Sequence, residues 1–392
     1  MPHYWELRAF HHFTVATSAT LPGTHIPEVK DCFAVQVPIL ALSHAPLWSE
    51  MVALGALHLL ETAASSTPPE GKEEEEDPKG LLACREAALE AALRTYRPVL
   101  GELGPHNADA AGFTAILLLI DAFATLRMAD QGRRTPSAAP ITAVGGDDCR
   151  GDGDDVYAPP MHWLRIARGA RVVLKTALTL ASTAAPPRRQ RDDDGETGIK
   201  ATNNAMSILT IIESYPRVHY DPATASATLR EGPPELHADT DNNCLTHLMI
   251  PLPGEPKQST EVIVAYAGAV QQLNLIQTAI AAAATAGKEK DGQKGVEKGK
   301  GKEDVRFLCR GMMAFPCLVP PLFLDLVERR EPRALVILAH FFAFMTRVRA
   351  LWWVGDTPVR EVRAICRALG SRYHRLMRVP LELVERWHDA TT

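Results

Sequence analysis

The sequence predicts an all-α protein, with helices packed around one central apolar helix. Between Ala334 and Met345 every residue except His340 is apolar, and apolar side chains continue at helical spacing to Trp352. A helix that is apolar almost all round is typical of the centre of a large helical domain or of a membrane span. The run is shorter than the roughly 20 residues that a span needs, so we expect a central core helix over residues 334–352. No stretch of any length alternates between apolar and polar residues as a half-buried strand does.

The composition is that of an ordinary globular protein. Of the 392 residues, 46% are hydrophobic and 23% are charged. The net charge of −5 gives no electrostatic reason for tight nucleic-acid binding by these residues alone. The seven cysteines are widely spaced and no C-x-x-C pair occurs, so we expect reduced, buried thiols and none of the common zinc sites. We also expect no signal sequence and no membrane span.

The first half of the chain predicts helices joined by short turns. Apolar residues recur at helical spacing over residues 4–21 and 81–103. Pro46 suits the first turn of a helix, because proline's fixed φ and missing N–H cost nothing there. Asn107 suits the N-cap of the helix that follows. The helix over residues 81–103 and its successor are therefore expected to form an antiparallel hairpin.

The second half of the chain continues this pattern. Residues 161–182 predict another helix, with Trp163 on its inward-facing side. Ser259 suits the N-cap of a long helix that ends near residue 286. The remaining helices are each marked by a proline where a first turn tolerates it: Pro320, Pro321, Pro332, Pro358 and Pro380. The helix from Pro358 is expected to run to Tyr373.

Four polar segments separate the predicted helices, over residues 66–80, 129–160, 186–198 and 288–304. They are rich in proline, glycine and charged residues, and such segments cannot bury enough apolar area to fold. The aspartates of the second segment do not follow EF-hand spacing, and the glycines and lysines of the fourth do not form a phosphate-binding loop. We therefore expect mobile loops around a single domain of residues 1–392.

No arrangement of residues typical of catalysis occurs in the sequence. It contains no G-x-S-x-G, no H-E-x-x-H and no G-x-G-x-x-G after a strand. His58, on an apolar helix face, is expected to be a hydrogen-bonded core histidine and not a metal ligand. We predict no catalytic residue and no metal site, and expect that the chain is not an enzyme.

An ordered set of segments resembles the C-terminal regulatory region of fungal zinc-cluster transcription factors, most closely the sterol-uptake-control branch. The resemblance implies a dimeric all-α domain that binds a hydrophobic effector, a sterol in the best-understood members, and controls access to the nucleus or to coactivators. The segments are FHHFTVATSATL, VPILALSHAPLWSEMVALGALHLL, AAGFTAILLLIDAFA, WLRIARGARVVL and FPCLVPPLFLDLVERREPRALVILAHFFAFMTRVRALWWVGD.

Members of this family usually carry a six-cysteine binuclear zinc cluster before the regulatory region. That cluster is absent from these residues, so we expect zinc, and direct DNA contact, only through a cluster outside this chain. The resemblance implies a regulator of RNA polymerase II transcription in the nucleus, with ligand-dependent shuttling from the cytoplasm. It also implies a homodimer that contacts the transcription machinery. The alternative is a non-sensing dimerisation or coactivator-binding scaffold on the same fold.

A hydrophobic effector needs large apolar walls and few polar groups around it. The central helix and its end supply five candidates: Phe341, Phe342, Met345, Trp352 and Trp353. Phe341 and Phe342 differ in direction by about 100°, so some of these side chains must pack in the core, and the alternative that all of them do stays open. Trp353 beside Gly355 could form a lid over a pocket mouth.

Overall fold

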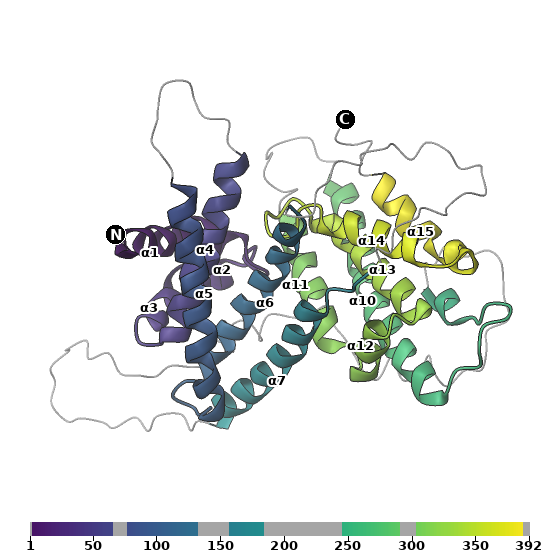
Figure 1. The fold of residues 1–392 in the computed structure, drawn as a ribbon, viewed down its shortest axis with the longest axis horizontal. Helices are drawn as coiled ribbons and strands as arrows, with labels where there is room; N and C mark the ends of the chain where they lie inside the picture. Colours follow the sequence, from purple (N-terminus) through teal and green to yellow (C-terminus); the bar gives the residue numbers. More distant parts are fainter. Residues whose placement is uncertain (1, 66–76, 132–156, 184–244, 291–302, 387–392) are drawn as a thin grey trace, which may run out of the picture. The chain divides into compact units, whose positions relative to one another are not determined.

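The computed structural model describes residues 2–65, 77–131, 157–183, 245–290 and 303–386. Within these ranges every regular element is a helix (Figure 1). The all-α prediction is therefore confirmed.

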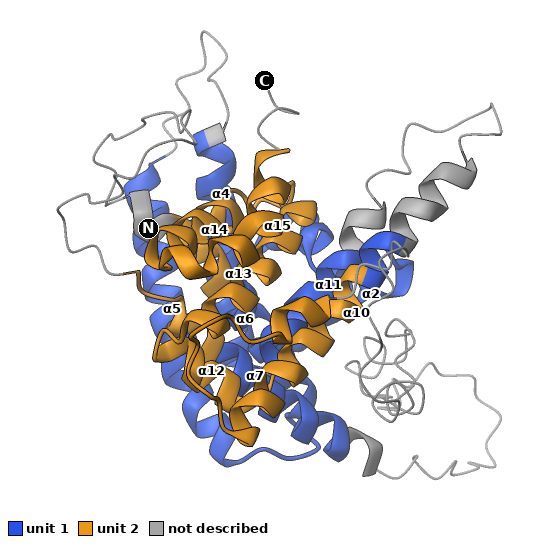
Figure 2. Cartoon of the chain, turned by 90° about the vertical axis from the view of Figure 1, so that its right-hand side faces the viewer, with its two compact units in different colours: residues 1–121, 166–243, 278–318 blue, residues 122–165, 244–277, 319–392 orange. Residues whose placement is uncertain are grey.

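The chain divides into two compact units (Figure 2). The first comprises residues 1–121, 166–243 and 278–318, and the second comprises residues 122–165, 244–277 and 319–392. Each unit is assembled from three separate stretches of chain, so neither is one continuous piece. The single domain expected over residues 1–392 stays a prediction.

The first unit contains most of the N-terminal helices, and a close helix crossing fixes its core. A Cβ added to Gly55 of α4 would lie 2.2 Å from the carbonyl oxygen of Ala9 in α1, so only glycine allows this approach. The bounds are α1 Pro2–His12, continued by η1 Phe13–Thr17 and η2 Ser18–Thr20; α2 Pro27–Asp31, η3 Cys32–Gln36 and α3 Val37–Ala41; α4 Ala45–Ser65, α5 Pro78–Gly101 and α11 Glu303–Leu318. Three helices have residues in both units: α6 Ala108–Gln131, α7 Met161–Thr183 and α10 Thr260–Lys290.

A buried ion pair joins α5 to α6 within the first unit, and the buried Glu50 of α4 lies near enough to feel both charges. Arg85 donates from Nη2 to both carboxylate oxygens of Asp121, each at 3.1 Å. Glu50 is fully buried, and its carboxyl oxygens have no hydrogen-bond partner within the described residues. Burial, and then the charge of Asp121, raise the pKa of Glu50 well above its usual range against the opposing effect of Arg85. A neutral Glu50 leaves one carboxylate for one guanidinium, which avoids an unpaired buried charge.

His58 is a hydrogen-bonded core histidine, as predicted. Its Nδ1 lies 2.9 Å from Oγ1 of Thr17 and 3.1 Å from Nε2 of His12. Burial, and the neighbouring His12, lower the pKa of His58 to about 4. The pair therefore joins the N-terminal helices to α4 as two neutral imidazoles at pH 7.

The second unit is built around α13 Pro332–Met345, in which every residue from Arg333 onward is buried. The other helices of the unit, α12, α14 and α15, pack against it. The predicted central helix is confirmed in place, and it begins at Pro332 as expected. The remaining bounds are η4 Leu245–Met249, α12 Pro321–Glu328, η6 Thr346–Val348, α14 Thr357–Ala368, η7 Ser371–Tyr373 and α15 His374–Glu385.

The predicted end of the central helix at Trp352 is wrong, because α13 stops at Met345. Thr346 turns its hydroxyl back to donate to the carbonyl oxygen of Ala343 at 2.6 Å, and the chain tightens into the 3-10 turn η6. Such hydroxyl-to-backbone bonds compete with a regular helix. Gly355, at φ +50°, then completes a turn that other residues rarely adopt.

Several predicted loop boundaries also need correction. Residues 77–80, placed in the first loop, begin α5, because the Asp77 side chain accepts a hydrogen bond from the Lys79 amide at 3.2 Å and caps that helix. Helices α6 and α10 continue through residues 129–131 and 288–290, and α11 includes residues 303–304. The rest of the four predicted loops, apart from residues 157–160, lies outside the described residues.

Two predicted helices near the C-terminus have different bounds. The helix predicted over residues 358–373 ends at Ala368, where Leu369 adopts an extended conformation. The last helix begins at His374, so Pro380 lies inside it and not in its first turn.

Helix α6 is the one described helix that could cross a membrane by length and hydropathy, over Ala108–Arg127. From the sequence we expected no membrane span. In the structure 78% of that apolar stretch is buried, which is typical of a core helix.

Candidate functional site around helix α13

Five aromatic side chains form a continuous cluster in the second unit. Phe123 of α6 lies edge-on to Trp163 of α7, with ring centroids 4.9 Å apart, and edge-on to Trp353 at 6.0 Å. Trp163 stacks on Phe341 at 6.0 Å and contacts Phe342 at 6.4 Å. All five side chains are fully buried. Rings at these separations and angles attract one another beyond the effect of burial alone.

The structure brings together three of the five predicted site residues. Phe341, Phe342 and Trp353 belong to the aromatic cluster, and adjacent Phe341 and Phe342 both reach Trp163 despite their different directions. Met345 is fully buried one turn further along α13, whereas Trp352 is partly exposed. That these residues bind a ligand stays a prediction, and the alternative that they are only core stays open.

Arginine side chains hold the end of α6 and the segment that begins at Trp352 to each other. Arg127 donates to the carbonyl oxygen of Trp352 and lies 3.8 Å from the Asp356 carboxylate. A Cβ added to Gly355 would lie 2.6 Å from Nε of Arg127, so a glycine is needed where the guanidinium passes. A second hydrogen bond runs from α14 to α6, where Arg360 donates to the carbonyl oxygen of Leu126 at 2.7 Å. These contacts fix the segment that carries Trp353.

His340 places a polar ring inside the apolar centre of α13. Its Nδ1 donates to the carbonyl oxygen of Val336 at 2.9 Å. Burial lowers the pKa of His340 to about 4, outweighing that hydrogen bond, and nearby His247 lowers it further. The ring is therefore neutral at pH 7, and because Nδ1 carries the proton, Nε2 is a bare acceptor. Within the described residues this buried Nε2 has no hydrogen-bond partner.

Four more buried polar atoms of the second unit share this feature. Nε1 of Trp163, Oε1 of Gln277 and the hydroxyls of Tyr266 and Thr357 have no hydrogen-bond partner within the described residues. Buried polar groups are hydrogen-bonded in the great majority of cases, and an exception calls for an explanation. An unpaired indole N–H can donate to a polar group of an otherwise apolar molecule, and an unpaired imidazole nitrogen can accept from one.

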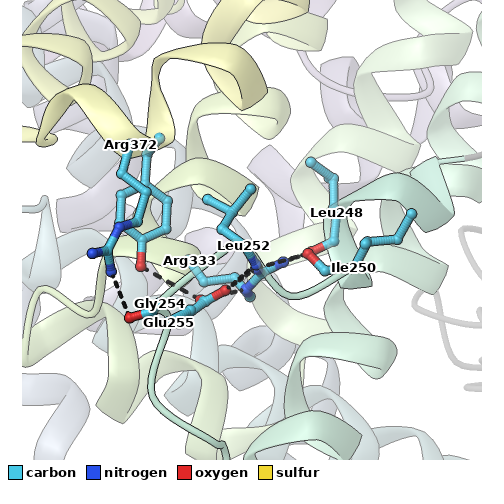
Figure 3. Close-up of polar contacts among 8 residues, drawn as sticks. Leu248, Ile250, Leu252, Gly254, Glu255, Arg333 and Arg372 are labelled. Atoms are coloured by element: carbon cyan, nitrogen blue, oxygen red, sulfur yellow. Dashed lines mark hydrogen bonds and ion pairs between the residues drawn. The ribbon is translucent and has the colours of Figure 1, made fainter.

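A buried ion pair secures the segment before α10 to the first turn of α13 (Figure 3). The side chains of Arg333 and Glu255 are 5% and 3% exposed. Arg333 donates from Nε to Glu255 Oε1 at 2.9 Å and from Nη2 to Glu255 Oε2. Its guanidinium also donates to the carbonyl oxygens of Leu248 and of Ile250, the latter at 3.0 Å. The guanidinium thus binds the segment 245–255 at several points.

Further hydrogen bonds complete this clamp. Glu255 Oε2 accepts from the Leu252 amide at 2.9 Å, and Oε1 lies 3.4 Å from the Tyr373 hydroxyl that donates to it. Arg372 donates to the carbonyl oxygen of Gly254 at 3.0 Å. Burial would raise the pKa of Glu255, but the hydrogen bonds from Arg333 and Leu252 hold it below its ordinary value. A buried carboxylate with this many donors stays ionised and anchors the segment.

Sequence reasoning missed the residues that support the cluster from outside α13. Trp163 was predicted as inward-facing, but not as a ring that joins Phe123 to Phe341. Arg333 and Arg127 gave no signal in the sequence, because their partners lie 78 and 225 residues away along the chain. His340 was noted as the one polar residue of an apolar run, and this was the only feature of the sequence that pointed to a polar group inside α13.

Comparison with known proteins decides the family. No family model matches the sequence. The chain is 30% identical over 339 residues to the Zn(2)-C6 fungal-type transcription factor afumD of Aspergillus fumigatus, an alignment that covers 86% of the chain and 67% of that protein. It is 25% identical over 390 residues to a Zn(2)-C6 fungal-type transcription factor of Gibberella zeae, covering 96% of the chain and 61% of that protein.

The chain belongs to the fungal Zn(2)-C6 transcription factors. This confirms the predicted family, while the sterol-uptake-control branch stays a prediction. Membership of a transcription-factor family fits the expectation that the chain is not an enzyme. The chain spans only 67% and 61% of the length of these two relatives.

The cysteines that the structure describes do not fit the zinc cluster after which the family is named. Burial raises the pKa of Cys32 to about 12, helped by Asp109 and Asp31, and burial also raises the pKa of Cys309. Zinc binds the thiolate, which these sites disfavour. No group of three potential metal ligands comes together among the described residues. We derive no zinc chemistry from this part of the chain.

The neutral state of His340 predicts a loss of stability in acid. Its pKa is about 4 in the fold against an ordinary value of 6.5, so the unfolded chain binds the proton first. Stability present above pH 6.5 should be lost as the pH falls towards 4, by up to about 3 kcal/mol at 1.36 kcal/mol per pKa unit. We expect His340→Asn, which can still donate to Val336, to flatten the pH dependence of the free energy of unfolding.

Chemical denaturation across this pH range measures the effect. His58 titrates in the same window, so His340→Asn should remove only part of the slope. His3→Asn is the control, because the side chain of His3 is 91% exposed. A His340→Asn protein with the same slope as the parent would contradict the neutral, buried state of His340.

Proposed function

We propose that this chain is the regulatory part of a Zn(2)-C6 transcription factor and that it senses a hydrophobic effector in its second unit, with a sterol as the expected class. The control of transcription follows from the family. The observation that supports an effector site is the set of buried polar atoms without partners around α13, chiefly Nε2 of His340 and Nε1 of Trp163.

The chemistry of these atoms favours a ligand that is mostly apolar with one or two polar groups. Pockets of this kind have apolar and aromatic walls and a small number of placed polar atoms. Phe341, Phe342 and Trp353 supply the walls. His340 offers an acceptor and Trp163 a donor. A buried hydrogen bond to His340 would remove the cost of leaving its ring nitrogen unpaired.

Entry of such a ligand requires side chains of the cluster to move, because the rings already contact one another. Met345 is the most adaptable wall, since its unbranched side chain fills irregular gaps in many conformations. The segment 352–356, which carries Trp353 and is held by Arg127, is the part that would have to move. Binding to the opened form would shift the chain between two states, as regulation requires.

One observation favours the second candidate function, a coactivator-binding scaffold. An open apolar groove of about 320 Å³ lies in the second unit, between the first turns of α10 and of α12. Thr260 and Glu261 lie at its border, and its apolar lining comprises Val264, Ala265, Pro320, Pro321 and Leu322. Grooves of this kind accept the apolar face of a partner helix. Because the scaffold function needs no effector, a ligand-binding assay distinguishes it from the effector-sensing function.

We assign the DNA-binding and zinc-binding functions of the family to sequence outside these residues. The chain carries a net charge of −5, and affinity for the phosphate backbone depends on positive charge. We propose that DNA is contacted through a zinc cluster elsewhere in the full protein. The protein would act in the nucleus with the transcription machinery, and effector binding would govern its transfer from the cytoplasm.

A gel-shift assay at physiological salt tests the assignment of DNA binding. The 392-residue chain should shift specific and random DNA duplexes no more than an acidic control protein does. Specific, salt-sensitive binding by this chain would contradict it.

Substitution of Met345 tests the effector site. Met345→Trp should fill an adaptable pocket, weakening binding of a fluorescent sterol at least about tenfold, which corresponds to 1.4 kcal/mol, with little change in melting temperature. His340→Phe should also weaken binding, because it removes the acceptor. Energy transfer from the tryptophans to the sterol, titrated against each variant, gives the affinities.

Met51→Trp is the matched control for overpacking, because Met51 is fully buried in α4 of the first unit. It should lose the 1–3 kcal/mol of stability, roughly, that overpacking costs and keep its sterol affinity if it folds. If Met345→Trp loses as much stability as Met51→Trp, the five predicted residues are core only. If the parent protein binds no sterol while Val264→Asp abolishes transcriptional activation, the scaffold function is the better account.

A further inference from the structure

The stretch over residues 362–381 is rich in arginine, although the protein as a whole is acidic. It contains five arginines and one histidine, and no lysine, aspartate or glutamate. The net charge of the whole chain is −5, so this stretch has the opposite sign to the rest. Neither the effector site nor the apolar groove between α10 and α12 uses it. A local excess of positive charge on an acidic protein attracts anions to that place.

Three of these arginines lie in one row on an exposed helical face. The 3-10 turn η7 passes directly into α15, so residues 371–385 form one continuous helical run. Arg372, Arg375 and Arg378 follow one another in it at intervals of three residues, and all three are exposed. Residues three apart on a helix are neighbours on its surface. We call these three residues the arginine row, which extends about 9 Å along the helix at 1.5 Å per residue.

The opposite side of this helical run is packed in the second unit and fixes the row. Helix α15 packs against α13 and α14, and its Met377 is fully buried. The Tyr373 hydroxyl donates to Glu255, and Arg372 donates from Nη1 to the carbonyl oxygen of Gly254 at 3.0 Å (Figure 3). The backbone beneath the row is therefore held in place before a partner arrives, which lowers the entropy cost of binding.

The row is only weakly neutralised within the described residues. Arg378 Nε lies 3.6 Å from Glu382 Oε1, and the two side chains are 78% and 49% exposed. An exposed pair of this kind contributes little, so another carboxylate can replace Glu382. Arg375 has no ion pair in the described part of the chain. The backbone hydrogen bond of Arg372 uses one of the five N–H donors of its guanidinium.

We propose that the arginine row binds an acidic segment of another protein and recognises its carboxylate side chains. Each guanidinium presents a planar fork of donors that binds a carboxylate through two parallel hydrogen bonds. A run of aspartates or glutamates places carboxylates on one side roughly every 5–7 Å, as a helix or as a strand. The side chains of the row are spaced by about 5–6 Å. Arginine clusters are a recurring means of binding acidic peptides.

Two features favour an acidic peptide over a nucleic acid. Single-stranded nucleic acids are bound largely by stacking of their bases on exposed aromatic rings. The one tyrosine of the stretch, Tyr373, is 8% exposed, and the stretch contains no tryptophan or phenylalanine. A DNA duplex carries one charge per about 1.7 Å along its whole length, so it would also approach the acidic parts of the chain. A short acidic segment needs to reach only the row.

Fluorescence anisotropy of a fluorescein-labelled polyglutamate peptide, titrated with the whole chain, tests the proposal. Polyglutamate should bind at low salt and be released as the salt concentration rises, because the attracting charges are exposed and screened. A polyglutamine peptide of the same length should not bind. Arg375→Gln combined with Arg378→Gln should weaken polyglutamate binding at least about tenfold, because charge-assisted hydrogen bonds are lost.

Arg94→Gln combined with Arg97→Gln is the matched control. These two arginines are exposed and three residues apart on α5 of the first unit, so the control changes the net charge of the chain equally. It should leave the affinity for polyglutamate nearly unchanged. Circular dichroism shows whether each variant folds. If the Arg375 and Arg378 glutamine variant does not fold, lysine at both positions replaces it, which keeps the charge, removes the planar fork and should still weaken binding.

Three results would overturn the proposal. The first is a parent chain that does not bind polyglutamate, or whose binding the two double variants weaken equally. The second is a single-stranded oligonucleotide that binds the row more tightly than polyglutamate does. The third concerns the chain's own acidic run at residues 73–77: glutamine at residues 73–76 should leave the affinity unchanged, and a higher affinity would assign the row to that run. None of these measurements depends on sterol binding, so this proposal and the effector site can fail separately.

Discussion

Helix α13 presents side chains in every direction, and all of them from Arg333 to Met345 are buried. Burial on all sides requires cover on all sides, and this constraint shapes the second unit. Helices α12, α14 and α15 pack against α13, and Phe123 and Trp163 bring rings from two other helices. Each large apolar side chain removed from water contributes roughly 1.5–3 kcal/mol, so this one helix supplies much of the driving force for the unit.

Complete burial also creates the features that suggest function. A polar atom inside such a helix must find a partner within the protein or leave its hydrogen bond unmade, at a cost of about 1–3 kcal/mol. His340 satisfies one ring nitrogen through Val336 and not the other. Arg333, at the other end of the helix, meets the same demand fully with Glu255 and two carbonyl oxygens. Arg333, which is fully hydrogen-bonded, therefore has a structural role. His340 keeps one ring nitrogen that can still accept a hydrogen bond.

The sequence was enough to predict α13 and most of the helices, because apolar spacing and proline positions are local signals. The N-cap at Ser259 is present, with its hydroxyl oxygen 3.4 Å from the Val262 amide. Asn107 precedes its helix as predicted, but its side chain binds the turn before it, through Gly104 and Glu102. The predicted helix to Trp352 ended early because a threonine hydroxyl favoured a tighter turn. The aromatic cluster could be predicted only from its α13 side, since Phe123 and Trp163 reach it from distant parts of the chain.

The most direct test of the effector site is the mass of what the protein retains. The 392-residue chain would be produced in a fungal host, purified without detergent, and measured by native mass spectrometry, with bound lipid then identified after extraction. A single bound sterol-sized lipid, present in the parent and lost in Met345→Trp and in His340→Phe, is the result we predict. A parent protein that carries no lipid, or a lipid retained equally by both variants, would contradict an effector site at α13.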